Sequence, residues 1–86
     1  MGRTEIRAGR RLRELRESLA LSMNNVRDTS VRIASTRKDR RFIVVPSRLS
    51  EIERGFTVPN IFRVYTLARV YRVAMQKVMK LYLESG

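Results

Sequence analysis

The chain has 86 residues, enough for one small domain whose single hydrophobic core is only just large enough. It contains no cysteine and no histidine, which excludes a disulfide framework, a thiolate metal site and the commonest general base. Its net charge of +11 comes from 19 basic and 8 acidic residues, and 16 of the basic residues are arginine. Because the arginine fork suits phosphate groups and guanine edges, nucleic acid is the favoured partner, ahead of an anionic membrane surface.

Several other functional classes lack the residues that they would need. The sequence has no apolar run of the roughly 20 residues that a membrane span requires, and no signal-peptide pattern. It also has no glycine-rich phosphate loop and no pair of carboxylates set in an apolar stretch. We therefore expect a cytoplasmic, nucleoid-associated protein that is not an enzyme and holds no cofactor or metal.

The first third of the chain predicts a short arm and two helices. Residues 1–5 are predicted as a flexible basic arm. Apolar residues then recur at steps of three and four from about residue 6 to 19, the spacing of one helix face. Ser22 suits the N-cap of a second helix, which we expect to end near residue 36. The residues predicted to face inward are Ala8, Leu12, Leu15 and Leu19 in the first helix, and Met23, Val26, Ser30, Ile33 and Ala34 in the second.

A charge cluster at residues 37–41 interrupts this second helix, and residues 42–45 (FIVV) have the composition of a strand. An isolated strand is not stable by itself. We therefore expect residues 42–45 either to lie as an extended segment over the core or to offer an edge to a partner.

Three more helices follow. The third is predicted at about residues 46–54, with Leu49 and Ile52 inward and Gly55 as its stop. The fourth and fifth are predicted after Asn60 and after residue 74, and five helices with mostly local contacts indicate an all-α bundle. Their predicted inward residues are Ile61, Val64, Tyr65, Leu67, Ala68 and Tyr71, then Met75, Val78, Met79 and Tyr82, so that Tyr65, Tyr71 and Tyr82 are core residues rather than stacking platforms.

Three stretches in order, GRRLRELRESLALS, SRLSEIERG and VPNIFRVYTLARVY, resemble the lambda-repressor/Cro-like (XRE) helix-turn-helix family over about residues 8–82. The resemblance implies a five-helix lambda-repressor-like bundle whose third helix is the recognition helix, placed in the major groove of double-stranded DNA. It also implies a partly buried salt bridge between Arg16 and Glu53 that sets the angle between the first and third helices. A Glu53 that is exposed and paired locally is the alternative.

The sequence departs from the family pattern at two places. Met23 stands where the family usually has a glutamine, so the DNA contact of that amide cannot be carried over. The second departure is about twelve additional residues before the recognition helix. Because Ile33-Ala34 also fits the family's Leu-Ala pair, about seven of them lengthen helix two by almost two turns, and about five enlarge the turn. We thus expect an extended basic turn over residues 36–45.

The third helix and the charge cluster supply the predicted DNA contacts. Arg48 is expected to read guanine, and Glu51 either accepts a hydrogen bond from cytosine or holds Arg48 in place. The cluster either contacts phosphate or is a solvated loop. The N-terminal arginines are likewise expected either to contact phosphate or to form a hydrated helix face; they are Arg3, Arg7, Arg10 and Arg11. The predicted base-edge contacts are Ser47, Arg48, Ser50 and Glu51, and the predicted backbone contacts are Ser22, Arg37, Lys38, Arg40, Arg41, Arg54 and Thr57.

The leading functional prediction is sequence-specific binding of double-stranded DNA by a transcriptional regulator. A homodimer is expected, joined through the fifth helix near residues 81–83 or through residues 42–45. Two alternatives stay open: an antitoxin-type protein-interaction module that also represses its own operon, and non-specific nucleic-acid binding by charge.

Overall fold

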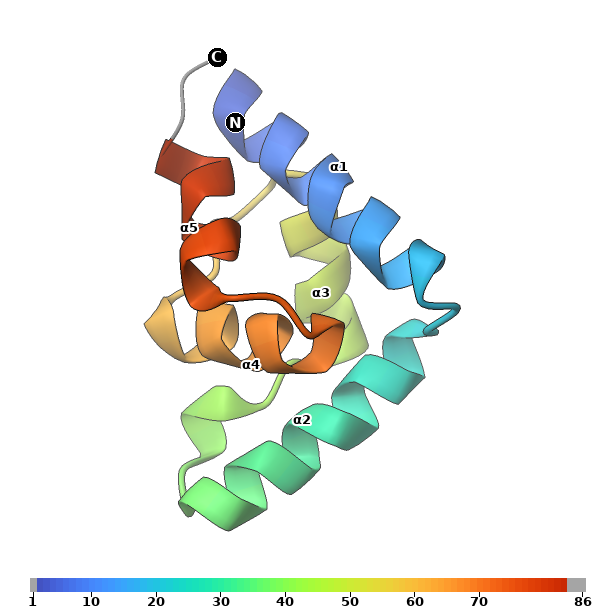
Figure 1. Ribbon diagram of the computed structural model, residues 1–86, viewed down its shortest axis with the longest axis vertical. Helices are drawn as coiled ribbons and strands as arrows, with labels where there is room; N and C mark the ends of the chain where they lie inside the picture. The colour runs from blue at the N-terminus through green and yellow to red at the C-terminus, as the bar shows by residue number, and fades with distance from the viewer. Residues whose placement is uncertain (1, 84–86) are drawn as a thin grey trace.

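A computed structural model describes residues 2–83, and within that range the chain forms five α-helices and one short 3-10 helix, with no strand. This confirms the all-α class. In Figure 1, α3 lies between α1 and α2, α5 runs beside α1, and α4 packs against α2 and α5. None of these helices combines the length and apolar character that crossing a membrane requires. The elements are α1 (Arg3–Ser18), α2 (Met23–Arg37), η1 (Arg40–Phe42), α3 (Pro46–Glu53), α4 (Ile61–Tyr71) and α5 (Met75–Leu83).

One core joins all five helices. Each helix contributes at least one buried apolar side chain, and α3 and α4 contribute more than one. Since none of these short helices can bury its apolar face alone, the bundle is held together mainly by burial of this shared cluster. Its members are Leu12, Val26, Val44, Leu49, Ile52, Val64, Leu67, Ala68, Tyr71 and Val78.

The N-terminal boundary differs from the prediction. α1 begins at Arg3, so residues 3–5 form its first turn and do not belong to a flexible arm; Met1 lies outside the described residues. At the other end, Ala20 has a left-handed φ of 55° and the helix stops at Ser18. Leu19, expected inward, is therefore the exposed C-cap.

The second helix is capped and lengthened as predicted. The hydroxyl of Ser22 accepts a hydrogen bond from the Asn25 backbone N–H at 3.0 Å, and the Asn25 side chain accepts one from the Ser22 N–H at 2.9 Å. This reciprocal cap satisfies two N–H groups that the first turn otherwise leaves without partners. α2 continues to Arg37, with Ala34 buried, and ends where Lys38 takes a left-handed φ of 55°.

Residues 42–45 do not form a strand. Phe42 ends η1, and the segment that follows is extended but has no neighbouring strand within the described chain. Val44 is fully buried, and its N–H donates to the hydroxyl of Ser30 in α2 at 3.0 Å. The hydroxyl of Thr66 in α4 donates to the Phe42 carbonyl at 2.6 Å. Of the two alternatives, the one in which this segment lies over the core is confirmed.

Two further residues predicted to face inward, Ile61 and Met79, are exposed. Ile61 is 54% exposed, because as the first residue of α4 it projects past the core. Met79 in α5 is also exposed. Conversely, Thr66 is fully buried, since its hydroxyl is satisfied by the carbonyls of Phe42 and Phe62.

Candidate nucleic-acid interface

α3 is attached to the bundle by one face and exposes the other. Leu49 and Ile52 are fully buried in the core. The opposite face is polar, and its residues are all at least partly exposed. The four residues predicted to contact base edges, Ser47, Arg48, Ser50 and Glu51, all belong to this face.

Within this polar face, Arg48 and Glu51 are paired. Arg48 Nη1 lies 3.2 Å from Glu51 Oε1, and the two side chains are 43% and 44% exposed. An ion pair this exposed contributes at most about 1 kcal/mol, so another hydrogen-bonding partner can replace it without a large penalty. The geometry agrees with Glu51 orienting Arg48, one of its two predicted roles.

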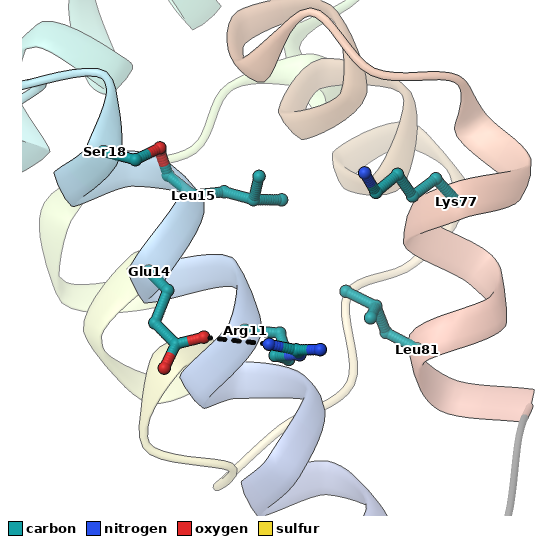
Figure 2. Close-up of a pocket in the computed structure, with 6 residues that line it drawn as sticks. All are labelled: Arg11, Glu14, Leu15, Ser18, Lys77 and Leu81. Carbon is teal, nitrogen blue, oxygen red and sulfur yellow. Dashed lines mark hydrogen bonds and ion pairs between the residues drawn. The ribbon is translucent and has the colours of Figure 1, made fainter.

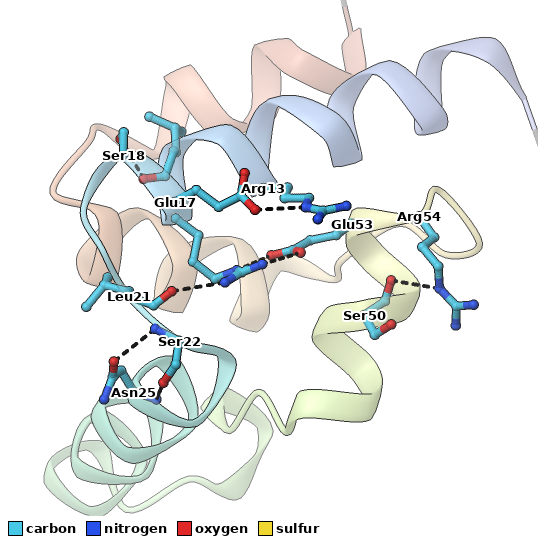
Figure 3. Close-up of polar contacts among 11 residues, drawn as sticks. Arg13, Glu17, Ser18, Leu21, Ser22, Asn25, Ser50, Glu53 and Arg54 are labelled. Carbon is cyan, nitrogen blue, oxygen red and sulfur yellow. Dashed lines mark hydrogen bonds and ion pairs between the residues drawn. The ribbon is translucent and has the colours of Figure 1, made fainter.

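The C-terminal end of α3 is held by the Arg16–Glu53 salt bridge that the family resemblance implied. Arg16 Nε is 2.7 Å from Glu53 Oε2, Arg16 Nη2 is 3.0 Å from Glu53 Oε1, and the two side chains are 11% and 3% exposed. Arg16 Nη1 also donates to the Leu21 carbonyl at 2.9 Å. Figure 3 labels Glu53 and Leu21, the two residues that accept these hydrogen bonds. The hydrogen bonds to Glu53 raise the pKa of Arg16, and the contacts join α1, the α1–α2 connection and α3.

A glycine that the sequence analysis did not single out controls the same helix crossing. A Cβ at Gly9 in α1 would lie 2.4 Å from the Ile52 carbonyl oxygen and 2.6 Å from that of Glu53. Only glycine permits this close approach of α1 to α3. The available signal was a glycine inside a helix, which costs about 0.5–1 kcal/mol relative to alanine and usually has a packing reason.

Gly55 has two roles at the end of α3. Its φ of +80° confirms it as the stop of that helix. A Cβ at this position would also lie 2.7 Å from the Ile6 Cα, so α1 passes directly against it. The predicted stop is therefore also a second contact point between α1 and the chain that leaves α3.

The basic cluster before α3 divides into two kinds of side chain. Arg41 is paired with Asp39, Nη2 to Oδ2 at 2.7 Å, and its guanidinium lies 4.0 Å from the Phe62 ring centroid. The Arg37 guanidinium lies 4.6 Å from the Tyr65 centroid and donates to the Tyr65 hydroxyl. The other two residues, Lys38 and Arg40, are exposed, and their side chains make no hydrogen bond or ion pair with other described residues. Of the four, these two are the better placed to contact phosphate.

The hydrogen bonds from Arg41 also lower the pKa of Asp39. Asp39 additionally caps η1, because its carboxylate accepts from the Arg41 backbone N–H at 2.9 Å. The carboxylate in the middle of the basic cluster is thus kept ionised and oriented by Arg41.

The other predicted backbone contacts are accessible but are dispersed over several elements. Arg54 directly follows α3; its Nε donates to the Ser50 carbonyl at 3.4 Å, and its guanidinium lies 4.5 Å from the exposed ring of Phe56. Thr57 is partly exposed, and Ser22 is exposed at the start of α2. The N-terminal arginines all lie in α1 and are exposed, which fits either contact with phosphate or a solvated helix face. They are Arg3, Arg7, Arg10 and Arg11.

The tyrosines belong to the core and its margin. Tyr71 is buried, and burial raises its pKa. Burial also raises the pKa of Tyr82 to about 12. Tyr65 is half-buried, with its ring in contact with Arg37 and with the edge of Phe42. Tyr71 is therefore a core residue, as predicted, whereas Tyr65 and Tyr82 lie at the margin of the core.

The surface has a cleft of about 350 Å³ between α1 and α5. Figure 2 shows Leu15 projecting from α1 toward Lys77 and Leu81 of α5. Arg11 at the rim is paired with Glu14, Nη1 to Oε1 at 3.4 Å, so the cleft carries both signs of charge. Among residues 2–83 there is no group of three or more histidine, cysteine, aspartate or glutamate side chains that could hold a metal ion.

Comparison with known proteins found no family model that matches the chain, no similar curated protein and no similar solved structure.

Proposed function

We propose that the protein is a lambda-repressor/Cro-like helix-turn-helix regulator that binds a specific double-stranded DNA sequence, with α3 as its recognition helix. The observation that carries the proposal is the asymmetry of α3. One face is fixed by Leu49, Ile52 and the buried Arg16–Glu53 pair, and the other presents Arg48 and Glu51 to solvent. An α-helix with its side chains is about 10–12 Å across, which fits the B-DNA major groove of about 12 Å.

Arg48 is the residue proposed to read the DNA sequence. Its guanidinium can donate two parallel hydrogen bonds to O6 and N7 of guanine, a contact that discriminates against other bases by about 1–3 kcal/mol. Glu51 holds it in position at 3.2 Å until the base replaces that contact, or accepts from the amino group of a neighbouring cytosine. Ser47 and Ser50 offer short hydroxyl groups on the same face.

The net charge of +11 supplies the attraction to the phosphate backbone. Lys38 and Arg40 precede α3 closely in the chain and are exposed, so they suit the phosphates that flank the groove. Arg37 and Arg41, which rest on aromatic rings, are assigned chiefly to holding the extended turn in place.

The proposed regulator binds as a homodimer through an apolar groove of about 200 Å³ between the start of α4 and α5. Exposed Val58 and Ile61 form one side, exposed Met79 and Leu83 form the other, and none of the described residues that line it is charged. A second copy is the occupant that we propose. Two chains of charge +11 repel each other least where both contacting surfaces are uncharged. A two-fold axis would place the groove of one copy against the same groove of the other. Residues 42–45 are the poorer candidate because Val44 is already buried.

The test is selection of bound sites from a pool of random duplexes, with the oligomeric state measured in solution. The wild-type protein should prefer its selected site over random DNA by roughly 10³-fold or more. Arg48→Ala should reduce this preference by about 5- to 150-fold, at one base position, since a bidentate base contact is worth about 1–3 kcal/mol. Arg13→Ala is the matched control, because Arg13 is an exposed α1 arginine paired with Glu17.

Equal affinity of the wild type for selected and random duplexes would instead favour non-specific binding by charge. Co-purification of a second small protein seated on the apolar groove would favour the antitoxin-type alternative. An unchanged selection profile for Arg48→Ala would remove α3 from its proposed role.

A further inference from the structure

A second concentration of positive charge lies in a cleft of about 270 Å³ between α2 and α4, and no residue that lines it belongs to α3. None of its lining residues in the described chain is acidic. This distinguishes it from the α1–α5 cleft, where Glu14 offsets the nearby arginine. The side chains that give this cleft its polar character are three arginines (Arg32, Arg37 and Arg69), two threonines (Thr29 and Thr36) and Tyr65.

Internal contacts already orient these guanidinium groups. Arg32 Nη2 donates to the Thr29 hydroxyl at 3.2 Å. Arg37 lies 4.6 Å from the Tyr65 ring centroid and donates to its hydroxyl, and the Arg69 guanidinium lies 6.0 Å from the same centroid. Contact with an aromatic face orients an arginine but does not neutralise it. Three positive charges therefore share one cleft without a carboxylate.

Like charges that line one cleft repel one another, so a ligand that carries several negative charges is favoured by each of them. Arginine forks match the oxygens of a phosphoryl group, and threonine hydroxyls supply neutral donors of the kind that also bind phosphate. The volume is slightly below the roughly 300–1,000 Å³ of drug-sized pockets, which favours a compact group. We propose that this cleft binds the phosphoryl group of a small phosphorylated ligand. The proposal does not depend on α3 binding DNA.

A duplex offers the same chemistry through its backbone phosphates, so the experiment must separate the two sources. ¹⁵N-labelled protein is titrated with sodium pyrophosphate at constant ionic strength, and amide and arginine Nε–H shifts are followed. Saturable changes are expected at residues 29–37 and 65–69. In Arg32→Gln/Arg69→Gln, pyrophosphate should bind about tenfold more weakly or worse, because two charge-assisted contacts are lost. Both side chains are exposed, so the variant should fold normally.

The matched control is Lys77→Gln/Lys80→Gln, which removes the same two charges from exposed positions on α5. It should leave pyrophosphate binding within about twofold of the wild type. Equal weakening in both double variants, or shifts spread evenly over all arginines, would overturn the proposal and indicate only a diffuse ion atmosphere. If pyrophosphate remains bound when a selected duplex is added, the phosphoryl group belongs to a free ligand. If the duplex displaces it from these residues, the same phosphoryl site serves the DNA backbone.

Discussion

Replacing Glu53 by glutamine tests whether the buried ion pair holds α3 in place. The carboxylate, 3% exposed, accepts from two donors of Arg16 at 2.7 and 3.0 Å. A glutamine has nearly the same shape, but it offers one acceptor oxygen and turns an N–H₂ toward the second donor. Arg16, only 11% exposed, would keep its charge without a compensating carboxylate. Removing one partner of such a pair costs about 3–5 kcal/mol.

A loss of this size is a large part of the protein's total free energy of unfolding. A chain of 86 residues has a free energy of unfolding of roughly 4–13 kcal/mol. Urea unfolding followed by far-ultraviolet circular dichroism measures the change directly, provided that the slope m stays constant. Glu17→Gln is the control, since Glu17 is 53% exposed in its pair with Arg13 and its loss should cost no more than about 0.5 kcal/mol.

A second variant separates the effect of the charges from the effect of side-chain packing. Arg16→Met/Glu53→Leu fills the site with apolar side chains of similar size, and it should recover most of the stability that Glu53→Gln loses. If Glu53→Gln costs no more than Glu17→Gln, the Arg16–Glu53 pair does not hold α1 to α3.

Three further predictions concern other parts of the fold. Gly9→Ala should lower the free energy of unfolding by about 1–3 kcal/mol although alanine favours helix, because its Cβ meets backbone oxygens of α3; a neutral or stabilising result in urea would contradict this close approach. The free energy of unfolding should fall as pH rises from 10 to about 12, because the pKa of Tyr82 is raised by burial and the unfolded chain ionises first. Tyr82→Phe should make that fall shallower in urea titrations, and an unchanged slope would count against the burial of its hydroxyl. Lys38→Ser/Arg40→Ser should flatten the slope of log affinity against log salt by up to about two units, whereas Arg41→Ser, already held by its own carboxylate, should change it less; equal effects would contradict this division of the basic cluster.

The helices themselves were predictable because the interactions that define them are local. The cap at Ser22, the proline that opens α3 and the left-handed Gly55 that closes it all act within a few residues. The lengthened α2 was predictable because two extra turns leave Ala34 on the buried face. Helix ends were predicted less well, as Leu19 and Ile61 show, since the same periodicity continues past the edge of the core.

The Arg16–Glu53 pair, unlike the helices, could not be predicted from local sequence alone. Periodicity alone leaves Glu53 either buried or exposed, and the expectation of a pair came from the family resemblance. The structure contains the pair, with both oxygens of the carboxylate used.

The sequence alone determined the five helices, the single core and the polar face of α3. The tertiary structure decided which cations of the basic cluster are held and which are exposed, because Arg37 meets Tyr65 28 residues further along the chain. It also decided that Val44 is buried and that α1 approaches α3 at Gly9. Local propensity is set by neighbours in sequence. The partner of a side chain across the bundle depends on how all the helices pack together, and no single segment carries that information.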